Sequence, residues 1–248
     1  MKKKGLSHMD IVITGGTSGI GYRIAKDLIA EGHQVIIIGQ DAAKGRASVA
    51  QLGKAAFFIQ ADLATKSGRN QALASIKYKV DKIHVLVHTA GVFPSSAEEN
   101  IKANLVPHYQ LTMGLADRLT GGRVLIITGD PQIIQQLSIC EEQETTLQRA
   151  RWLLTHKALL TLFLSYLLAE KEITVNSFFP GNVTDELPHY SQTLLHTEVP
   201  VGKYLALHPD LTQSTGNFFD NDRNLVLLNA RQYNYDNAEK HLLQYLTE

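Results

Sequence analysis

The segment that most constrains the fold of this chain is a short apolar run followed by a glycine-rich turn. It reads D-I-V-I-T-G-G-T-S-G-I-G-Y-R-I-A-K-D-L-I-A-E-G-H-Q-V-I-I-I-G over residues 10–39. Residues 11–13 and 35–38 are apolar runs of the kind that form buried strands, and the apolar residues between them recur at helical spacing. This order predicts a strand, a turn, a helix and a second strand, which together form a βαβ unit.

Three glycines, at positions 15, 19 and 21, occupy the predicted turn. Glycine there lets the backbone turn sharply, lets it approach a pyrophosphate closely and lets the helix pack tightly on the sheet. The N-terminus of the following helix also presents unpaired N–H groups to an anion. Because a strand precedes the motif and a helix follows it, the segment predicts a dinucleotide site, with a glycine turn that binds nothing as the alternative.

The rest of the chain alternates apolar strand candidates with helical patterns, which is typical of a parallel sheet. We therefore predict an α/β fold: one Rossmann domain over residues 9–248, a doubly wound parallel sheet of about seven strands with helices on both faces. Residues 1–8 are expected to be a disordered or tag-derived tail. The further strand candidates are 57–60, 83–87, 124–128, 173–179 and 216–220, and the helix candidates lie near 65–79, 97–119 and 145–170.

Composition excludes several classes of protein. Lys plus Arg equals Asp plus Glu, at 24 each among 248 residues, so no basic field favours binding to nucleic acid. The most apolar stretch, residues 153–169, is too short for a membrane span and carries His156 and Lys157, so we predict a buried helix there. The single cysteine, Cys140, cannot form an intrachain disulfide, which favours a reducing cytoplasm. No metal site is predicted.

The spacing T-G-x-x-x-G-I-G resembles that of the short-chain dehydrogenase/reductase family, and the resemblance continues to the end of the chain. Some details, such as I-G-Y-x-I-A-x-D-L and T-G-N-F-F-D, resemble the retinol-dehydrogenase-like branch. The other matching segments are Asp62-Leu63, His88-Thr89-Ala90-Gly91 with His in place of the usual first Asn, Asn104, and Pro180-Gly181.

The resemblance implies a nicotinamide dinucleotide as cofactor. Asp62 is expected on the adenine side, Lys157 at the nicotinamide ribose, and Pro180-Gly181 beside the nicotinamide. Residues 182–214 are expected to form the mobile lid that selects the substrate. The implied cofactor contacts are Gly15, Thr17, Ser18, Gly19, Ile20, Gly21, Gln40, Asp62, Leu63, Ala90, Gly91, Lys157, Pro180, Gly181 and Val183.

The choice between NAD and NADP depends on the end of the second strand, where an acidic side chain would accept a hydrogen bond from the ribose 2′-hydroxyl. Gly39 and Gln40 stand there, so neither usual selector is present. Asp41 lies two positions late and is at least as well explained as the cap of a helix that starts at Ala42. Lys44 and Arg46 could reach a 2′-phosphate, so both cofactors stay open and NADP is favoured.

The catalytic motif departs from the family pattern. The family uses Y-x-x-x-K, in which the phenol protonates the alkoxide and the lysine lowers the pKa of the phenol, together with a serine that orients the carbonyl. Here L-L-T-H-K over residues 153–157 keeps Lys157 but places Leu153 at the tyrosine position. Asn104 is retained, whereas Gly129 or Asp130 stands where the serine belongs.

A substitute acid would have to come from elsewhere in the chain. A histidine titrates near neutral pH, although isolated histidines more often pack or face solvent. The candidates are His88, His108, His156 and Asp130.

Two functions therefore follow from the sequence. The favoured one is a dinucleotide-binding protein that is weak or inactive as a carbonyl reductase, and the alternative is an oxidoreductase that uses a non-standard acid on an unidentified carbonyl or alcohol. We also predict a homodimer or homotetramer built on helices 97–119 and 145–170. The second of these is apolar almost all round and needs cover on every side, with full burial inside a monomer as the alternative.

Overall fold

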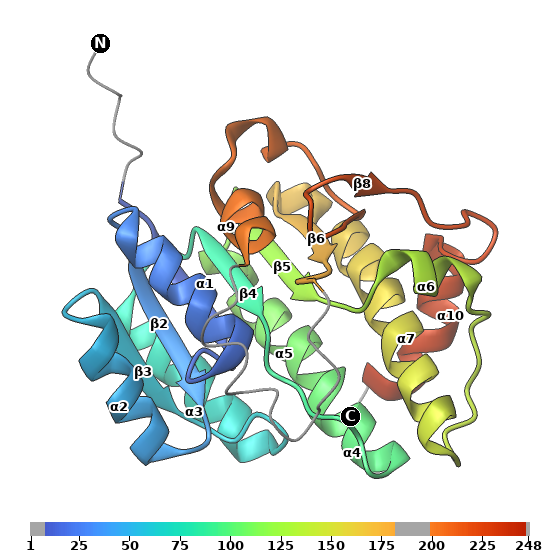
Figure 1. Cartoon of the computed structure of the whole chain (residues 1–248), viewed down its shortest axis with the longest axis horizontal. Coiled ribbons are helices and arrows are strands. Elements are labelled where there is room, and N and C mark those ends of the chain that lie inside the picture. Colours follow the sequence, from blue (N-terminus) through green and yellow to red (C-terminus); the bar gives the residue numbers. More distant parts are fainter. Residues whose placement is uncertain (1–7, 182–198, 247–248) are drawn as a thin grey trace.

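The computed structural model describes residues 8–181 and 199–246. These residues form one α/β domain around a single sheet with the strand order β3-β2-β1-β4-β5-β6-β7-β8 (Figure 1). The strands from β1 to β7 pair in parallel, which confirms the predicted fold class. The strands are β1 Asp10–Thr14, β2 Gln34–Gly39, β3 Ala56–Gln60, β4 Val85–His88, β5 Arg123–Ile127, β6 Thr174–Phe178, β7 Asn217–Phe219 and β8 Leu225–Val226.

The strand β8 was not predicted, and it pairs antiparallel with β7. A tight turn brings the chain back: the Asp220 carboxylate accepts hydrogen bonds from the N–H groups of Asp222 at 2.9 Å and Asn224 at 2.8 Å. A two-residue strand carries too short a pattern to be recognised in sequence.

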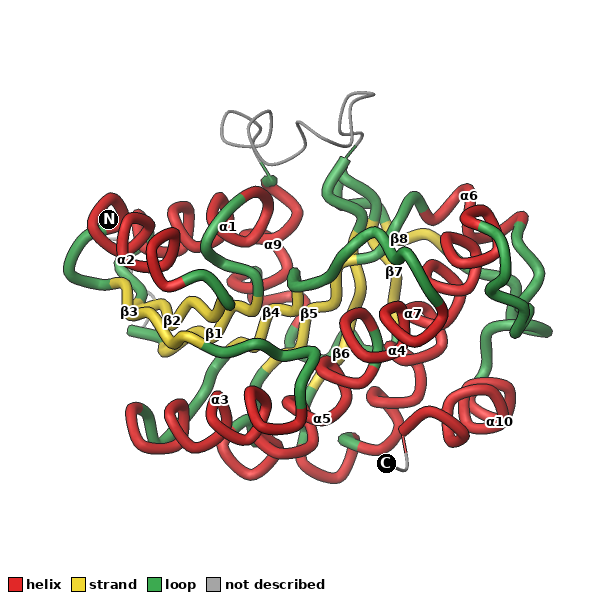
Figure 2. Tube along the Cα trace, turned by 90° about the horizontal axis from the view of Figure 1, so that it is seen from below, coloured by secondary structure: helices red, strands yellow, loops and turns green. Residues whose placement is uncertain are grey.

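Helices cover both faces of the sheet, as predicted (Figure 2). Residues of β1 alternate between the faces, so that Val12 joins one apolar cluster while Ile11 and Ile13 join the other. One cluster includes α1 Gly19–Ala30, α2 Ala42–Leu52 and α9 Pro200–Leu207; the other includes α3 Lys66–Lys79, α5 Val106–Leu115, α6 Pro131–Gln136, α7 Thr146–Leu167 and α10 Tyr235–Leu246.

The predicted helix 97–119 is interrupted. It divides into α4 Ala97–Asn104, α5 and a short 3-10 turn over Ala116–Arg118, with the break at Leu105. Pro107 lies in the first turn of α5, where its missing N–H does no harm, but it cannot continue a preceding helix. The predicted helix 145–170 forms α7, which begins at a capping box made by Thr145 and Gln148.

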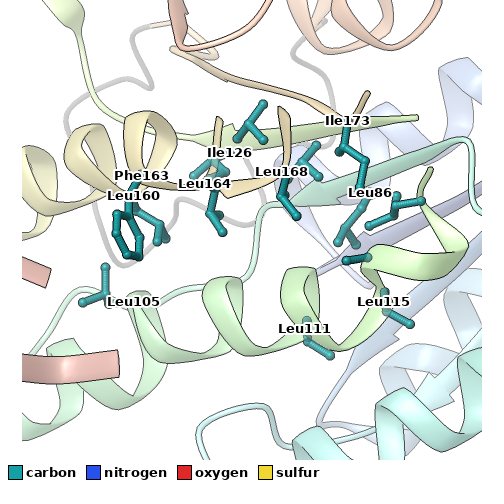
Figure 3. Packing of buried hydrophobic residues seen from close by; sticks show 14 of the residues in the cluster. Leu86, Leu105, Leu111, Leu115, Ile126, Leu160, Phe163, Leu164, Leu168 and Ile173 are labelled. Atoms are coloured by element: carbon teal, nitrogen blue, oxygen red, sulfur yellow. The ribbon is translucent and has the colours of Figure 1, made fainter. Parts of the chain in front are cut away.

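The apolar helix α7 is covered within the chain. Toward the sheet, α7 packs on β6, and its Leu160 and Leu164 belong to the same buried apolar cluster as Leu111 and Leu115 of α5 (Figure 3). Away from the sheet, α10 lies along α7 (Figure 1), and the ring of its Tyr235 stacks on Phe163 with 5.8 Å between centroids.

Polar contacts link the same two helices through Glu141, which lies in the loop before α7. The Glu141 carboxylate accepts hydrogen bonds from His241 Nδ1 of α10, at 2.6 Å, and from the Tyr245 hydroxyl, and it lies 3.3 Å from Nε2 of His156 in α7. The homo-oligomer was predicted because α7 needed cover on its second face, and α10 supplies that cover here. The oligomeric state itself stays a prediction, with less reason to expect it through α7.

The expected lid, residues 182–214, is described only from residue 199 onward. That part begins with α9, in which Val201 and Leu205 are buried. A Cβ atom on Gly202 would lie 2.6 Å from Cδ1 of Ile24, so α9 packs closely on α1. This portion therefore contributes to the core, and a lid role for the remainder stays a prediction.

Candidate functional site

A cavity of about 680 Å³ opens at the carboxyl ends of the central strands. It lies where β1 has β2 on one side and β4 on the other, the place where open parallel sheets usually bind ligands. The lining residues are Gly15, Thr17, Ser18, Gly19, Ile20, Gly21, Ile38, Gly39, Gln40, Ala61, Asp62, Leu63, Ala64, Thr89, Ala90, Gly91, Val92, Phe93, Ala103, Asn104, Ile127, Thr128, Gly129, Leu153, Leu154 and Lys157.

The glycine turn forms one wall of this cavity. Gly15 and Gly19 have φ values of +71° and +55°, in the left-handed region that favours glycine. A Cβ atom on Gly15 would lie 2.8 Å from the Ala90 nitrogen, so the turn packs directly on the backbone after β4. Ser18, the N-cap of α1, makes no side-chain capping bond. The N-terminus of α1 therefore offers N–H groups that can receive a pyrophosphate.

The end of β2 presents no carboxylate for a ribose. Gly39 and Gln40 line the cavity, whereas Asp41 caps α2 by accepting from the N–H groups of Ala43 at 2.8 Å and Lys44 at 3.0 Å. Those backbone hydrogen bonds lower the pKa of the Asp41 carboxyl below its ordinary value. The interpretation of Asp41 as a helix cap is confirmed.

Lys157, Asn104 and Gly91 lie close together at the inner end of the cavity. Lys157 is only 6% exposed, and burial lowers its pKa to about 8. A Cβ atom on Gly91 would lie 3.7 Å from Lys157 Nζ and 2.6 Å from Asn104 Oδ1. The Asn104 amide accepts from the Val92 N–H at 2.8 Å and donates to the Val92 carbonyl at 3.0 Å. Its side chain thus fixes the turn after β4 beside the lysine.

Leucines occupy the place expected for the phenol and its hydroxyl partner. Leu153 lines the cavity one helical turn before Lys157. A Cβ atom on Gly129 would lie only 2.3 Å from Cδ2 of Leu154, so the Leu154 side chain fills the space beside Gly129. Gly129 lines the cavity, whereas Asp130 caps α6 through the Gln132 N–H at 2.8 Å. Of the two positions considered for the missing serine, Gly129 is the one that faces the cavity.

Thr128 brings a hydroxyl to the cavity wall next to Gly129. The residue lines the cavity and is 7% exposed, and its Oγ1 atom is buried without a hydrogen-bond partner in the described part of the chain. A buried hydroxyl of this kind reaches a ligand only if the side chain rotates.

The candidate substitute acids lie outside the cavity lining. His88 and His108 are fully buried; burial, aided by the charge of Lys157, lowers the pKa of His88 to about 3 and that of His108 well below its ordinary value. His108 Nε2 is 3.0 Å from the Ala90 carbonyl, so it donates there. His156 stacks on Trp152 with 4.0 Å between ring centroids, and its Nε2 lies 3.3 Å from a Glu141 oxygen.

These contacts keep the three imidazoles away from the ligand space. At the inner end, among the residues that the structure describes, Lys157 is the ionisable side chain that lines the cavity. No group of three or more His, Cys, Asp or Glu side chains is placed to hold a metal ion within residues 8–181 and 199–246. None of the helices described is both long and apolar enough to cross a bilayer.

The protonation of Lys157 leads to a pH prediction. The ammonium form can donate to ribose hydroxyls, and that form is lost as the pH rises through about 8. We expect the affinity for NADH, whose pyrophosphate does not titrate in this range, to fall across that interval. Calorimetric titrations at several pH values measure this. Lys157→Met should bind more weakly at low pH and lose most of the dependence; an unchanged pH profile in that variant would contradict the assignment.

Sequence reasoning missed several lining residues, including Val92, Phe93 and Ala64. They follow strand ends without a motif of their own, so only the sheet topology points to them. Pro180 and Gly181 follow β6 and are not among the lining residues, although Gly181 has a φ of +107°, as a tight turn requires. Val183 lies outside the described residues.

Comparisons with known proteins place these features in context. A family model described as short chain dehydrogenase matches residues 10–129. A human polyprenol dehydrogenase is 26% identical over 193 residues, covering 70% of this chain and 58% of that protein. A zebrafish (Danio rerio) polyprenol dehydrogenase is 29% identical, covering 71% of this chain and 62% of the other. The match thus spans about three fifths of the length of these relatives.

Solved structures agree on the fold. The Pseudomonas aeruginosa RhlG/NADP active-site complex superposes with a TM-score of 0.68 and 21% identity, covering 89% of this chain and 97% of the other. The 3-ketoacyl-(acyl-carrier-protein) reductase from Brucella melitensis, complexed with NADH, gives a TM-score of 0.67 at 19% identity over 86% of this chain and 96% of that one. At this level of sequence identity, the superpositions support the fold and nothing more specific.

Proposed function

The chain belongs to the short-chain dehydrogenase/reductase family, and on that premise we propose that it binds NADP(H) or NAD(H) while reducing carbonyls weakly or not at all. A dinucleotide fits this cavity with its pyrophosphate at Gly19. The support comes from the glycine turn that forms one wall (the glycine wall), from the start of α1, which has no side-chain cap, and from buried Lys157. Such a cofactor would supply the hydride. The residues of the chain would bind it and orient it.

The observation that carries the second half of this proposal is Leu153. It lines the cavity one turn before Lys157, where an acid would have to stand. Losing a positioned general acid lowers the rate by roughly 10²–10⁴-fold. Losing the donor that orients the carbonyl lowers it by about 10²–10³-fold more if the two effects are independent. An alkoxide formed in this cavity would lack both groups.

NADP is the cofactor that we favour. With Asp41 engaged as a helix cap, no carboxylate at the end of β2 selects the 2′-hydroxyl or repels a 2′-phosphate. Lys44 and Arg46, both exposed on α2, can approach a phosphate there. A cytoplasmic location remains part of the proposal and rests on the lone free Cys140.

The second candidate function is an active oxidoreductase in which the Lys157 ammonium protonates the alkoxide. The observation that favours this function is the pKa of Lys157, which burial lowers to about 8. An ammonium with that pKa is a stronger acid near neutral pH than an ordinary lysine. The apolar Val92 and Phe93 at the cavity would then suit an apolar alcohol or carbonyl. The polyprenol dehydrogenases among the relatives are compatible with that class.

A paired measurement separates the two functions. Titration with NADP⁺, NADPH, NAD⁺ and NADH should give saturable binding, with NADP(H) preferred. A carbonyl and alcohol panel, followed through cofactor absorbance, should give negligible turnover. Turnover that disappears in Lys157→Met while NADPH still binds would favour the second function. A preference for NAD of more than about tenfold, or ~1.4 kcal/mol, would contradict the NADP proposal.

A further inference from the structure

The loop between β3 and α3 is held by a buried guanidinium. Asp62, Leu63 and Ala64 of this loop line the cavity. From α3, Arg69 Nη1 donates hydrogen bonds to the Leu63 and Ala64 carbonyls, both at 2.9 Å. Arg69 is only 7% exposed and is not itself a lining residue. It therefore reaches the cavity only through the backbone that it holds.

A second contact fixes the guanidinium on its other side. Arg69 Nε donates to Gln110 Oε1 of α5 at 2.6 Å. Burial lowers the pKa of Arg69 from its ordinary value while the nearby Asp62 charge opposes the shift, and a guanidinium stays protonated at any physiological pH. Charge-assisted hydrogen bonds to two carbonyls are stronger than neutral ones. The loop is thus tied to α5 through one side chain.

The loop has little freedom to adopt another course. A Cβ atom on Gly68 would lie 2.0 Å from the Asp62 carbonyl oxygen, so α3 meets the loop at backbone contact. The same oxygen accepts from the Thr65 hydroxyl at 2.9 Å. The Leu63 and Ala64 carbonyls point to Arg69 and not into the cavity. Carbonyl oxygens facing the cavity would repel the ring nitrogens of a purine, which are also acceptors.

We propose that Arg69, braced by Gln110, is a positioning residue for the adenine end of the site. It shapes the Asp62–Ala64 wall that meets the base without touching the nucleotide. This inference rests on the proposed dinucleotide binding. It predicts an effect confined to one half of the dinucleotide, which a general loss of stability would not produce.

The test uses the two halves of the cofactor as separate probes. Arg69→Met keeps the length of the side chain and removes its donors, leaving the Leu63 and Ala64 carbonyls without this partner. We expect at least about tenfold weaker binding of NADPH and of 2′,5′-ADP. The affinity for reduced nicotinamide mononucleotide should stay within about twofold, and Arg69→Lys should fall between wild type and Arg69→Met. Calorimetry measures the tight complexes and ligand-observed NMR the weak ones.

A matched control is available in Arg118. Its Nη1 donates to the Val80 carbonyl at 2.9 Å and to Asp81, away from the cavity, so Arg118→Met should leave all three affinities unchanged. If Arg69→Met does not fold, Gln110→Leu removes the hydrogen bond to Arg69 Nε while keeping the guanidinium, and it should weaken 2′,5′-ADP in the same half-specific way.

Each outcome bears on the inference. Equal losses for both halves, or no loss for 2′,5′-ADP, would overturn the role of Arg69 while leaving dinucleotide binding intact. Wild-type protein that binds neither NADPH nor NADH would overturn the proposed function and this inference together.

Discussion

Replacement of Gly19 by valine is expected to abolish dinucleotide binding, raising the dissociation constant at least about 100-fold, which corresponds to ~2.7 kcal/mol. Gly19 has a φ of +55°, and a β-branched side chain in the left-handed region strains the backbone. The new side chain would also occupy the space where the start of α1 approaches the pyrophosphate. Titration with NADPH measures the loss, and thermal unfolding shows whether the domain survives.

Gly32 provides a matched control for this substitution. It follows α1 at the opposite end, has a φ of +91°, and a Cβ atom added there would meet nothing within 4 Å. Gly32→Val therefore imposes comparable backbone strain away from the cavity, and binding should be retained. Undiminished affinity in Gly19→Val would rule out a pyrophosphate at the glycine wall.

On the proposed function, an acid placed at position 153 is expected to produce carbonyl reduction. Leu153→Tyr places a phenol one helical turn before Lys157, whose ammonium can stabilise the phenolate. We expect the rate to rise by roughly 10²–10⁴-fold over wild type, the usual contribution of a general acid. Cofactor oxidation against a carbonyl panel measures it. Leu153→Phe, which supplies the ring without the hydroxyl, should give no gain.

On the proposed function, the site also lacks the serine that would orient the carbonyl. From sequence alone, a Ser at Gly129 or Asp130 would complete the site. In the structure Asp130 caps α6, and Leu154 Cδ2 would lie 2.3 Å from a Cβ atom at Gly129. Gly129→Ser requires the Leu154 side chain to shift, so it should help more when combined with Leu154→Ala than alone. The triple variant with Leu153→Tyr should then exceed Leu153→Tyr alone by on the order of 10²-fold.

Two results would contradict this account of the active site. One is robust wild-type turnover that survives Lys157→Ala, because it would place the acid elsewhere. The other is a failure of Leu153→Tyr to raise turnover although NADPH binds normally, because it would mean that Leu153 does not stand where the substrate reacts.

The local parts of this molecule could be predicted from sequence. The glycine turn, the alternating elements and the cap at Asp41 depend on short stretches of chain whose patterns have direct physical causes. The break before Pro107 follows from the same rules, although the predicted helix ran through it. The family resemblance pointed to Lys157, Asn104 and Leu153, and the structure places all three at the cavity; their roles stay predictions.

Other features depend on residues that meet only after folding. Glu141 and His241 are a hundred positions apart, and Arg69 acts on a loop that it reaches through the packing of α3 and α5. The contact of Leu154 with Gly129 joins a helix to the end of a strand. No local sequence pattern around Leu154 or Gly129 predicts that contact. Such pairings are set by sheet order and helix packing, so a single sequence does not reveal them.

The Leu154 contact also bears on how such a site changes over generations. A serine at position 129 would displace Cδ2 of Leu154, and shrinking Leu154 first removes packing from the core cluster that it contacts. The effect of a substitution at either position therefore depends on the residue at the other. In the evolution of such a site, positions 129 and 154 are therefore expected to change together.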